Sequence, residues 1–422
     1  MKAEAELVRV SIDKLVYGGQ GLATLPDGRK VFVWNALPGE EVAARIFRNK
    51  PSYAEAVAER IITPSSERRA PRDDAYLATS PWQILDYKAE NGYKRNIAVE
   101  LFARENVSLP SVGDTISKRK QWRYRNKMEY SFWGDETGLQ LALYERGTHH
   151  KQSVKGSSIA MASVDSAANG VLMELRRLKV RAGDLKTIIV RSSQQGDTVA
   201  ALFTKTRSFP ELRLPVGLNG IQLYYSNPKS PASVPTGLLQ EQGTVVLQDT
   251  LLQQRFFYDV NSFFQVNPPV FERVLERIRE YGDDPVLLDM YAGTGTIGLS
   301  VGREHVELVE IDAASAAMAR ENARVARLDV EIIEAPAERA LQRIVADKPV
   351  IFDPPRAGLH QNIVDRILAV QPPKVIYLSC NPATQARDVA KLQQEYNVVF
   401  FEVYNFFPHT PHIETLAILA KK

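Results

Sequence analysis

Residues 7–62 alternate between apolar and polar positions in short runs. A period of two is typical of strands that bury one face, as in VRVSIDKL and KVFVWNAL. Between these runs, YGGQGLATLPDGRK supplies turn glycines and an Asp-Gly hairpin signal. The pattern therefore predicts a small β-barrel, followed by a linker that begins at Pro64 and includes the charged run ERRAPRDD.

The middle of the chain changes its period twice. Residues 83–107 repeat apolar side chains at helical spacing, which predicts a helix. From Trp122 to Leu251 the strand pattern returns, and one predicted helix over residues 169–181 interrupts it. The strand-like runs are YSFW, LQLALYE, KTIIVRSS, TVAALFTK, GIQLYYS and GTVVLQD. These runs predict a β-rich central domain.

After Pro268 strand-like and helix-like segments alternate. The strand-like runs are PVLLDM, VELVEI, VEII, PVIFD, KVIYLS, VVFFEVY and ETLAILA. Helices are expected between them, for example over Ala313–Ala326 and residues 383–395. This alternation predicts an α/β fold built on a parallel, doubly wound sheet.

Charge narrows the possible partners only in part. Lys+Arg number 53 and Asp+Glu 50, so the net charge of +3 is a weak indication of a polyanionic partner. Between Ser117 and Lys155, nine Lys/Arg stand against four Asp/Glu, with aromatic residues interleaved: Trp122, Tyr124, Tyr130, Phe132 and Trp133. Basic groups beside aromatic faces fit a single-stranded RNA site, and an amphipathic hairpin with a solvated face fits equally well.

The chain has one cysteine, Cys380. A single thiol excludes an intrachain disulfide and any zinc or iron–sulfur site built from several cysteines. The N-terminal MKAEAELVRV lacks the apolar core of a secretion signal, and no apolar run approaches the roughly 18 residues of a membrane helix. We therefore expect a cytoplasmic protein without a membrane partner.

The segment LLDMYAGTGTIGLS places a glycine-rich turn between an apolar strand and a helix, where backbone can approach a ligand. Its glycines fit the G-x-G-x-x-G of dinucleotide-binding folds: Gly293, Gly295 and Gly298. Asp289 also fits the D-x-x-x-G-x-G of S-adenosylmethionine binders. The next strand ends in Glu310 and Asp312, and an acid there binds ribose hydroxyls in either fold. This segment alone is compatible with a dinucleotide or with S-adenosylmethionine, and Asp312 is alternatively a helix cap.

Two later predicted strands end in polar residues followed by proline. PVIFDPPRAGL carries Asp353 and Arg356, and KVIYLSCNP carries Cys380. In an open α/β sheet, ligands bind beyond the carboxyl ends of the strands, and the prolines fix turns there. Cys380 on its own is typical of a small buried hydrophobe. At this position we interpret it as a nucleophile, which requires a thiol pKa lowered by Arg356 or a helix N-terminus.

The last predicted strand opens with Glu414, in NFFPHTPHIETLAILAKK. A carboxylate at the start of an apolar strand is costly unless it is exposed or used, so a rim-exposed glutamate and a functional acid both remain open. His409 and His412 precede it, and two histidines near a turn are more typical of structural or solvated groups. We predict no metal site there.

Five segments of the chain are FFQVNP, LDMYAGTGTIGL, FDPPRAGL, LSCNP and HIETLAIL. They occur in the order found in RNA uracil-5-methyltransferases, a family that the chain resembles over essentially its whole length. The N-terminal barrel resembles a TRAM domain, which is an OB-like β-barrel that binds RNA. The resemblance implies a Rossmann-like class I S-adenosylmethionine-dependent methyltransferase domain. We expect a TRAM barrel at residues 1–62, a central RNA-binding domain at 63–82 and 117–255, and a catalytic domain at 83–116 and 256–422.

By this resemblance, Cys380 is the nucleophile and Glu414 the general base. Thiolate addition at uracil C6 makes C5 nucleophilic, C5 takes a methyl group, and removal of the C5 proton expels the thiolate. The expected S-adenosylmethionine contacts are Gln265, Tyr291, Gly293, Gly295, Thr296, Glu310 and Asp353. Thr296 stands where many members have asparagine, and Pro336 stands where others have a polar residue near the adenine.

The resemblance implies RNA as the partner and no metal. Phe263 is expected to stack on the flipped base, and Arg356 to face the target nucleotide or its phosphate. Arg125 and Lys127 are expected to contact RNA. Members with a TRAM domain more often modify large-subunit ribosomal RNA, so 23S rRNA is the expected target, with a transfer RNA uridine in the T-loop as the alternative. We expect a monomer.

Many relatives carry a four-cysteine iron–sulfur cluster after the TRAM domain, in a P-R-C-x5-C-x2-C pattern with a distant fourth cysteine. Here the frame of that pattern is kept by Pro71, Arg72 and Gln83, and the fourth position falls near residues 163–165. The other ligand positions hold Asp73, Thr79 and Trp82. We therefore predict no cluster and a segment held by apolar packing, with Trp82 as the filler.

Other functions use parts of the same pattern. Cytosine-5 methylation also needs a cysteine nucleophile, but RNA enzymes of the familiar type use two cysteines, and DNA enzymes use a Pro-Cys in another motif. A nicotinamide oxidoreductase explains the glycine loop, but neither D-P-P-R nor Cys380. An RNA chaperone or assembly factor without chemistry needs neither Cys380 nor Glu414.

Overall fold

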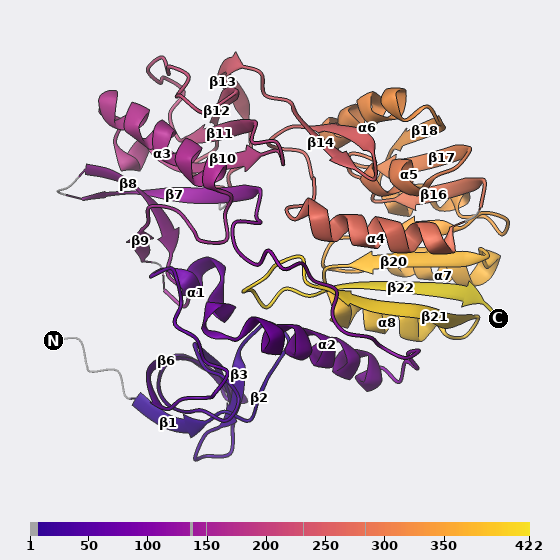
Figure 1. The fold of residues 1–422 in the computed structure, drawn as a ribbon, viewed down its shortest axis with the longest axis horizontal. Helices are drawn as coiled ribbons and strands as arrows, with labels where there is room; N and C mark the ends of the chain where they lie inside the picture. The colour runs from indigo at the N-terminus through magenta and orange to yellow at the C-terminus, as the bar shows by residue number, and fades with distance from the viewer. Residues whose placement is uncertain (1–6, 136–137, 149, 231, 283) are drawn as a thin grey trace.

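The computed structural model describes residues 7–135, 138–148, 150–230, 232–282 and 284–422. Figure 1 shows three bodies: an indigo N-terminal barrel, a magenta central domain, and an orange-to-yellow domain that ends at the C-terminus. The long helix α2 (Tyr87–Arg104) leaves the barrel and runs along the third body beside α8 (Pro382–Leu392). Within the described ranges, no helix combines the length and the apolar character needed to cross a bilayer.

The barrel is a six-stranded sheet in the order β1-β5-β6-β4-β3-β2. Its inward positions are small apolar side chains such as Val31, Ala44 and Ala54, all fully buried. The interior of a small barrel has room for few large side chains, so this composition fits the closure. The strands are β1 (Leu7–Ser11), β2 (Lys14–Leu15), β3 (Gly21–Thr24), β4 (Lys30–Trp34), β5 (Glu41–Asn49) and β6 (Tyr53–Thr63).

The central domain is a seven-stranded sheet in the order β13-β12-β11-β10-β7-β8-β9, with helix α3 packed on one face. Apolar side chains on alternate positions of the strands form a core with the helix. The elements are β7 (Lys127–Asp135), β8 (Gly138–Tyr144), β9 (Lys151–Ser153), α3 (Ala162–Arg177), η2 (Ala182–Asp184), β10 (Leu185–Ser192), β11 (Thr198–Thr204), β12 (Gly220–Tyr225) and β13 (Gly237–Gly243).

Two predictions for this domain were wrong in their bounds. The helix expected over residues 169–181 is α3, which begins at Ala162, because its buried face already starts at Val164. Gly170 lies in mid-helix, where a side chain would have its Cβ 3.3 Å from Pro215. The single strand expected over residues 243–249 is divided between two sheets, since Gly243 turns the chain with a φ of +73°.

The third sheet has the order β18-β17-β16-β19-β20-β22-β21. All pairs from β18 to β20 are parallel, but β22 is antiparallel to both of its neighbours. The predicted parallel sheet was therefore wrong for β22. Residues 405–413 are the whole connection from β21, shorter than the dozen or so residues that a parallel crossover needs. The strands are β16 (Val286–Met290), β17 (His305–Glu310), β18 (Asp329–Glu334), β19 (Val350–Phe352), β20 (Lys374–Ser379), β21 (Tyr396–Tyr404) and β22 (Glu414–Lys421).

Helices cover both faces of this sheet. One face packs against α2, α7 and α8, and the other packs against α4, α5 and α6. The second core also contains the hairpin β14–β15 and three side chains of the central domain, Val199, Ala201 and Phe203. The remaining elements are β14 (Leu247–Leu251), β15 (Gln254–Tyr258), α4 (Pro268–Tyr281), α5 (Thr296–Val301), α6 (Ala313–Ala326), η3 (Ala337–Arg339), η4 (Leu341–Arg343) and α7 (Gln361–Val370).

The segment that follows the barrel is held by hydrogen bonds as well as by packing. The Gln83 side chain accepts from the backbone N–H of Arg72 at 2.8 Å and donates to Asp73 at 2.9 Å. The Asp73 carboxylate in turn accepts from Ser158 N at 2.9 Å. The segment contains α1 (Tyr76–Thr79) and η1 (Pro81–Ile84), and Trp82 is buried as predicted. The prediction that apolar packing alone holds the segment was wrong, because these polar groups also join it to the central domain.

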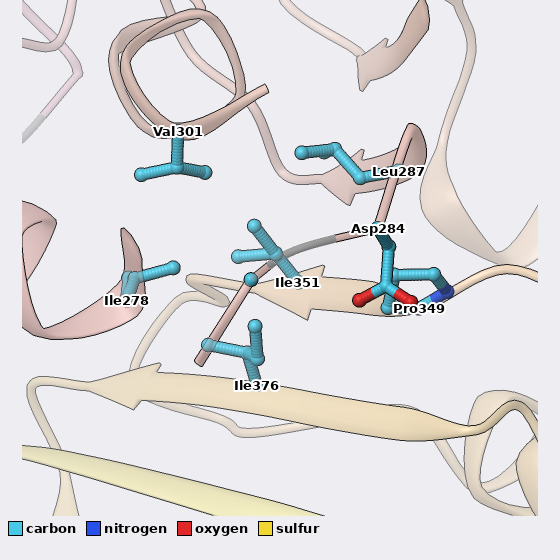
Figure 2. A pocket seen from close by; sticks show the side chains of 8 residues that line it. Ile278, Asp284, Leu287, Val301, Pro349, Ile351 and Ile376 are labelled. Atoms are coloured by element: carbon cyan, nitrogen blue, oxygen red, sulfur yellow. The ribbon is translucent and has the colours of Figure 1, made fainter. Parts of the chain in front are cut away.

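A small void lies inside the third body, near the amino ends of its parallel strands. Figure 2 shows that Ile278, Leu287, Val301, Ile351 and Ile376 point towards it. Its volume of about 10 Å³ is the space of one water molecule. The void is a packing imperfection of the core, at the end of the sheet opposite to the polar strand ends.

Replacing Gln83 by alanine tests the polar network that follows the barrel. The variant leaves the backbone N–H of Arg72 and the carboxylate of Asp73 with fewer partners, so we expect the free energy of unfolding to fall by about 1–3 kcal/mol. Urea denaturation measures the change. Gln394→Ala is the control because Gln394 is exposed. A loss no larger than that of the control would contradict the structural role.

Candidate active site

The candidate active site lies at the carboxyl ends of the parallel strands. Asp353 follows β19 and Cys380 follows β20, and these strands are neighbours in the sheet. Glu414 opens β22. Ser379 pairs with Thr415 in the antiparallel ladder, so the next step along the two chains brings Cys380 opposite Glu414. The structure thus brings the three predicted groups together on one rim.

The thiol of Cys380 is partly buried, and its pKa is raised to about 11. Burial is the main cause, and the negative charges of Glu414 and Asp353 add to it, whereas Arg356 opposes the shift. The expectation that Arg356 or a helix N-terminus lowers this pKa was therefore wrong in the ligand-free protein. The acids that surround the thiol outweigh the single guanidinium.

Glu414 is buried, with 4% of its surface exposed. Burial raises the pKa of its carboxyl well above the usual range, Asp353 raises it further, and Arg356 and Lys94 oppose this. Among the described residues, no donor is hydrogen-bonded to the carboxylate. The alternative of a rim-exposed glutamate does not apply, and the group is free to exchange a proton with a ligand.

The loop that precedes Glu414 is fixed by a buried ion pair on α2. Lys94 and Glu90 are both fully buried and lie 2.8 Å apart. Lys94 donates to Asn405 Oδ1 at 2.6 Å, and Glu90 accepts from the backbone N–H of His409 at 2.9 Å. The sequence analysis missed this pair, since both residues lie in a helix of ordinary polar appearance.

The glycine loop is shaped as the sequence predicts. Gly298 allows α5 to pack closely, because a Cβ there would lie 2.6 Å from Leu308, and its N–H donates to Asp289 at 2.8 Å. The two carboxylate oxygens of Glu310 accept from Gly293 N and Asp312 N, each at 2.7 Å. Asp312 itself caps α6.

Burial raises the pKa values of two acids next to the loop. The pKa of Asp289 is raised to about 8, mainly by burial and also by Asp353 and Glu310. Burial raises the pKa of Asp353 to about 7. One carboxylate oxygen of Asp289, Oδ1, is buried without a partner in the described part of the chain. An unused buried acceptor beside a glycine loop suits a ligand that donates a hydrogen bond.

The other expected cofactor residues surround the same loop. Tyr291 precedes it at a φ of +66°, and its hydroxyl donates to Glu338 at 3.3 Å. Thr296 is the first residue of α5, and Gln265 is buried at the start of the segment that leads to α4. Pro336 lies between β18 and η3, beyond the carboxyl end of β18.

Phe263 is 60% exposed beside the glycine loop, where its ring lies 3.9 Å from a Cβ built on Gly293. Its segment is held by Arg191, a fully buried residue of β10. The guanidinium donates to the carbonyls of Asp259, Ser262 and Phe264 at 3.0, 2.6 and 2.5 Å. Arg191 was missed because an arginine within a strand pattern gives no sign of distant carbonyl partners.

The basic stretch of residues 117–155 was interpreted either as an RNA site or as an amphipathic hairpin, and its residues divide between the two. Tyr124, Tyr130 and Phe132 are core residues, as an amphipathic hairpin predicts, whereas Trp133 is 45% exposed. Arg125 and Lys127 lie near the Phe263 segment, since Asn126 between them donates to Gln265 O at 3.1 Å. Burial and the charge of Arg191 lower the pKa of Lys127 to about 7.

The two histidines before Glu414 differ in their surroundings. His409 is buried and stacks on Trp122, with ring centroids 3.7 Å apart, as a structural histidine does. His412 Nδ1 lies 3.4 Å from a guanidinium nitrogen of Arg356, and burial together with that cation lowers the His412 pKa to about 4. A neutral His412 thus faces the guanidinium that is expected to contact RNA.

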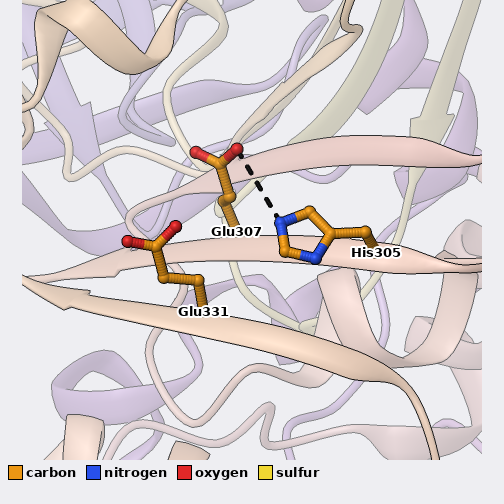
Figure 3. A group of neighbouring side chains, drawn as sticks. All are labelled: His305, Glu307 and Glu331. Carbon is orange, nitrogen blue, oxygen red and sulfur yellow. Dashed lines mark ion pairs between the residues drawn. The ribbon is translucent and has the colours of Figure 1, made fainter.

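A separate group of side chains, His305, Glu307 and Glu331, lies on β17 and β18 (Figure 3). Cations already neutralise it: Lys348 and Arg343 pair with Glu307, and Arg343 lies 2.6 Å from Glu331. His305 begins β17, so the group starts at the amino end of the sheet. We interpret it as an ion-pair network that braces these strands.

Comparison with known proteins shows which proteins the chain is similar to. A model described as tRNA (Uracil-5-)-methyltransferase matches residues 238–422, and a TRAM domain model matches residues 3–58. Uncharacterized RNA methyltransferases of Enterococcus faecalis and Thermotoga maritima are 27% and 28% identical to the chain, covering 99% and 98% of it and 97% and 99% of the relatives. The chain is therefore similar to RNA uracil-5-methyltransferases over residues 238–422 and to TRAM domains over residues 3–58.

One solved structure is similar over the full length of the chain. It is the tRNA (uracil-54, C5)-methyltransferase of Pyrococcus abyssi in complex with S-adenosyl-L-homocysteine, with a TM-score of 0.78 and 24% identity. The similarity covers 98% of this chain and 100% of that one. It confirms the predicted fold, a class I methyltransferase domain with an N-terminal TRAM barrel.

The residues of the rim fit S-adenosylmethionine as a ligand. The unpartnered Oδ1 of Asp289 and the oriented carboxylate of Glu310 lie on either side of the glycine loop. S-Adenosylmethionine carries an ammonium, which can donate a hydrogen bond to the free acceptor of Asp289, and ribose hydroxyls, which an acid at this strand end binds. Asn322 supports the loop from α6 by donating to Thr294 O at 2.9 Å, and it too was missed from sequence.

The single thiol makes the electrostatics of Cys380 measurable. With a raised thiol pKa, the thiolate fraction of the free enzyme should increase about tenfold per pH unit from pH 7 to pH 10. Alkylation by iodoacetamide, followed by intact mass, should increase in rate with the same slope. Free cysteine in the same buffers is the control and should level off above about pH 8.5. An enzyme rate that levels off below pH 9 would show that the thiol pKa is not raised.

Proposed function

We propose that the enzyme methylates C5 of a uridine in structured RNA, with Cys380 as nucleophile and Glu414 as proton acceptor, and that its target is 23S ribosomal RNA. The observation that carries the proposal is the meeting of Cys380 and Glu414 at the carboxyl rim, one step beyond the Ser379–Thr415 pair. A thiol and an acid on neighbouring strands, next to a donor site, match covalent methylation.

The chemistry requires both groups because uracil C5 is too poor a nucleophile to take a methyl group directly. The Cys380 thiolate adds to C6, which forms the Sγ–C6 bond and moves electron density to C5. S-Adenosylmethionine, when bound, supplies the methyl group that C5 takes. Glu414 then accepts the C5 proton, and the freed electron pair expels the thiolate from C6. The net change exchanges the C5 hydrogen for a methyl group.

The burial of Glu414 supports its role as a proton carrier. In its ionised form, a carboxyl whose pKa is raised is a stronger base than an exposed glutamate. Phe263, with its exposed ring beside the donor loop, is suited to stack on a base taken out of its helix. Arg356 is exposed on the same rim and is suited to bind a phosphate of the target.

A transfer RNA uridine is the second candidate. The Pyrococcus abyssi enzyme that resembles the full chain is named for uracil 54 of tRNA, and the matching family model also carries tRNA in its description. Both RNAs offer a uridine in a structured loop, and the same site chemistry serves either. The RNA that lacks the modified base in a deletion strain distinguishes them.

We also propose that the enzyme works without an iron–sulfur cluster. The four positions that hold cysteines in many relatives contain no cysteine here, since the only one is Cys380. Asp73, at the first of these positions, is hydrogen-bonded to Gln83 and to Ser158 of the central domain. Purified enzyme should contain no stoichiometric iron by chemical assay, and one cluster equivalent per chain would contradict this.

Cys380→Ala is expected to abolish methyl transfer and to leave RNA binding within about twofold, because the thiol forms the covalent bond and contributes little to affinity. Wild-type enzyme should form a gel-stable adduct with 5-fluorouridine RNA and S-adenosylmethionine, since fluorine cannot leave as a proton. Loss of the adduct in Cys380→Ala is the control. A deletion phenotype rescued fully by Cys380→Ala would favour an assembly factor without chemistry.

Glu414→Gln is expected to accumulate a methylated adduct with normal RNA, because addition and methylation proceed while the C5 proton has no acceptor. Mass spectrometry of the denatured complex should show the enzyme joined to an RNA one methyl group heavier. Turnover at the wild-type rate by this variant would remove Glu414 from the proton-accepting role.

Mapping 5-methyluridine by mass spectrometry in RNA from a deletion strain tests the target. We expect one modified uridine to disappear from 23S rRNA and to return with wild-type enzyme, but not with Cys380→Ala. Loss of the base from the T-loop of tRNA alone would assign the second candidate.

A further inference from the structure

The hairpin turn between β2 and β3 of the barrel reaches the catalytic rim. The hydroxyl of Tyr17 donates to Asn381 Oδ1 at 2.8 Å, which joins the barrel to the residue directly after Cys380. From the sequence, this turn is marked only by its glycines. Tyr17 is 37% exposed, so its ring borders both the protein interior and the open rim.

The turn has little freedom to move. Gly19 adopts a φ of +96°, and a Cβ at this residue would lie 2.3 Å from the Cβ of Pro411. The carbonyl of Gly19 accepts from the indole N–H of Trp82 at 2.9 Å. Because Pro411 belongs to the loop before Glu414, the turn contacts the segments of both the nucleophile and the proton acceptor.

Asn381 is the centre of the turn that carries Cys380. Its Oδ1 accepts from the backbone N–H groups of Ala383 and Thr384, at 3.1 and 3.4 Å, and so caps α8. Its Nδ2 donates to the carbonyl of Arg356 at 2.8 Å. The Tyr17 hydroxyl therefore adds a donor to the oxygen that fixes the backbone between Cys380 and the first turn of α8.

The Tyr17 hydroxyl keeps its proton at working pH. Burial raises the pKa of Tyr17 to about 12, and the charges of Cys380 and Glu414 also raise it, against the effect of Arg356. A tyrosine that feels the charges of these groups lies close to them. Its hydrogen bond to Asn381 is consequently available throughout the pH range of the reaction.

We propose that Tyr17 is a positioning residue for Cys380, supplied by the RNA-binding barrel to the catalytic domain. It acts through Asn381, by holding the turn so that the thiol faces the uracil when the barrel is docked. The inference deepens the proposed function and rests on it, because it assigns a second role to a domain otherwise expected to contribute affinity alone. RNA that binds the barrel is thereby coupled to the geometry of the attacking atom.

Tyr17→Phe removes the hydroxyl and keeps the ring. The rate constant for adduct formation with 5-fluorouridine RNA at saturating RNA should fall about threefold to tenfold, the range for one lost hydrogen bond. The Kd for the RNA and the melting temperature should stay unchanged. Tyr53→Phe is the matched control, because Tyr53 is also on the barrel and its hydroxyl has no hydrogen bond among the described residues.

A second readout is independent of the methylation chemistry. Iodoacetamide should alkylate Cys380 at least twofold faster in Tyr17→Phe than in wild type or Tyr53→Phe, because a looser turn exposes the thiol more often. Gly19→Ala, which displaces the whole turn, should change both readouts in the same direction.

The two readouts separate the possible failures. A wild-type enzyme that forms no adduct refutes the proposed function, and the alkylation rates then decide on Tyr17 alone. Equal alkylation in wild type and Tyr17→Phe would overturn the positioning role. A slower adduct rate explained entirely by weaker RNA binding would overturn it as well, since an affinity module would then suffice.

Discussion

The reversed direction of β22 is the constraint on which the active site depends. Glu414 is the first residue of a strand of eight, and it stands opposite Cys380 only because β22 runs against β20. In a parallel strand the same residue would lie at the other end of the sheet, about 25 Å away at roughly 3.3 Å per residue. The short connection of residues 405–413 enforces the reversal, so the loop length and the chemistry are linked.

Buried charged residues from outside the catalytic sheet hold the loops that surround Cys380 and Glu414. Arg191 of the central domain secures the segment of Phe263 through three carbonyls, and the Lys94–Glu90 pair of α2 secures the loop before Glu414. Removing one partner of such a buried pair typically costs about 3–5 kcal/mol, because the other charge is left without compensation. Loops fixed in this way can present reactive groups with little disorder.

The sequence predicts much of this arrangement, for physical reasons that also set its limits. Apolar periodicity reports which face is buried, so the barrel, the central sheet and the alternating layers were predicted, and motifs located Asp353 and Cys380 at strand ends. Periodicity carries no direction, so the reversal of β22 was missed. The raised pKa of Cys380 was missed because it depends mainly on burial and also on Glu414 and Asp353, and only the fold supplies both. Arg191, Asn322 and Tyr17 act through distant backbone or amide partners that leave no local pattern.

The core shared between two of the bodies has a consequence for how the protein can change over time. Val199, Ala201 and Phe203 of β11 belong to the same core as side chains of α4 and β15. A different central domain could therefore replace this one only if it presented an apolar face of the same shape to the catalytic domain. The barrel instead has a core made of its own strands, with Leu15 and Leu37 extending into the neighbouring one. Recombination should therefore transmit the central and catalytic domains as one heritable unit, whereas an exchanged barrel has only to keep the contacts of its β2–β3 turn with the catalytic rim.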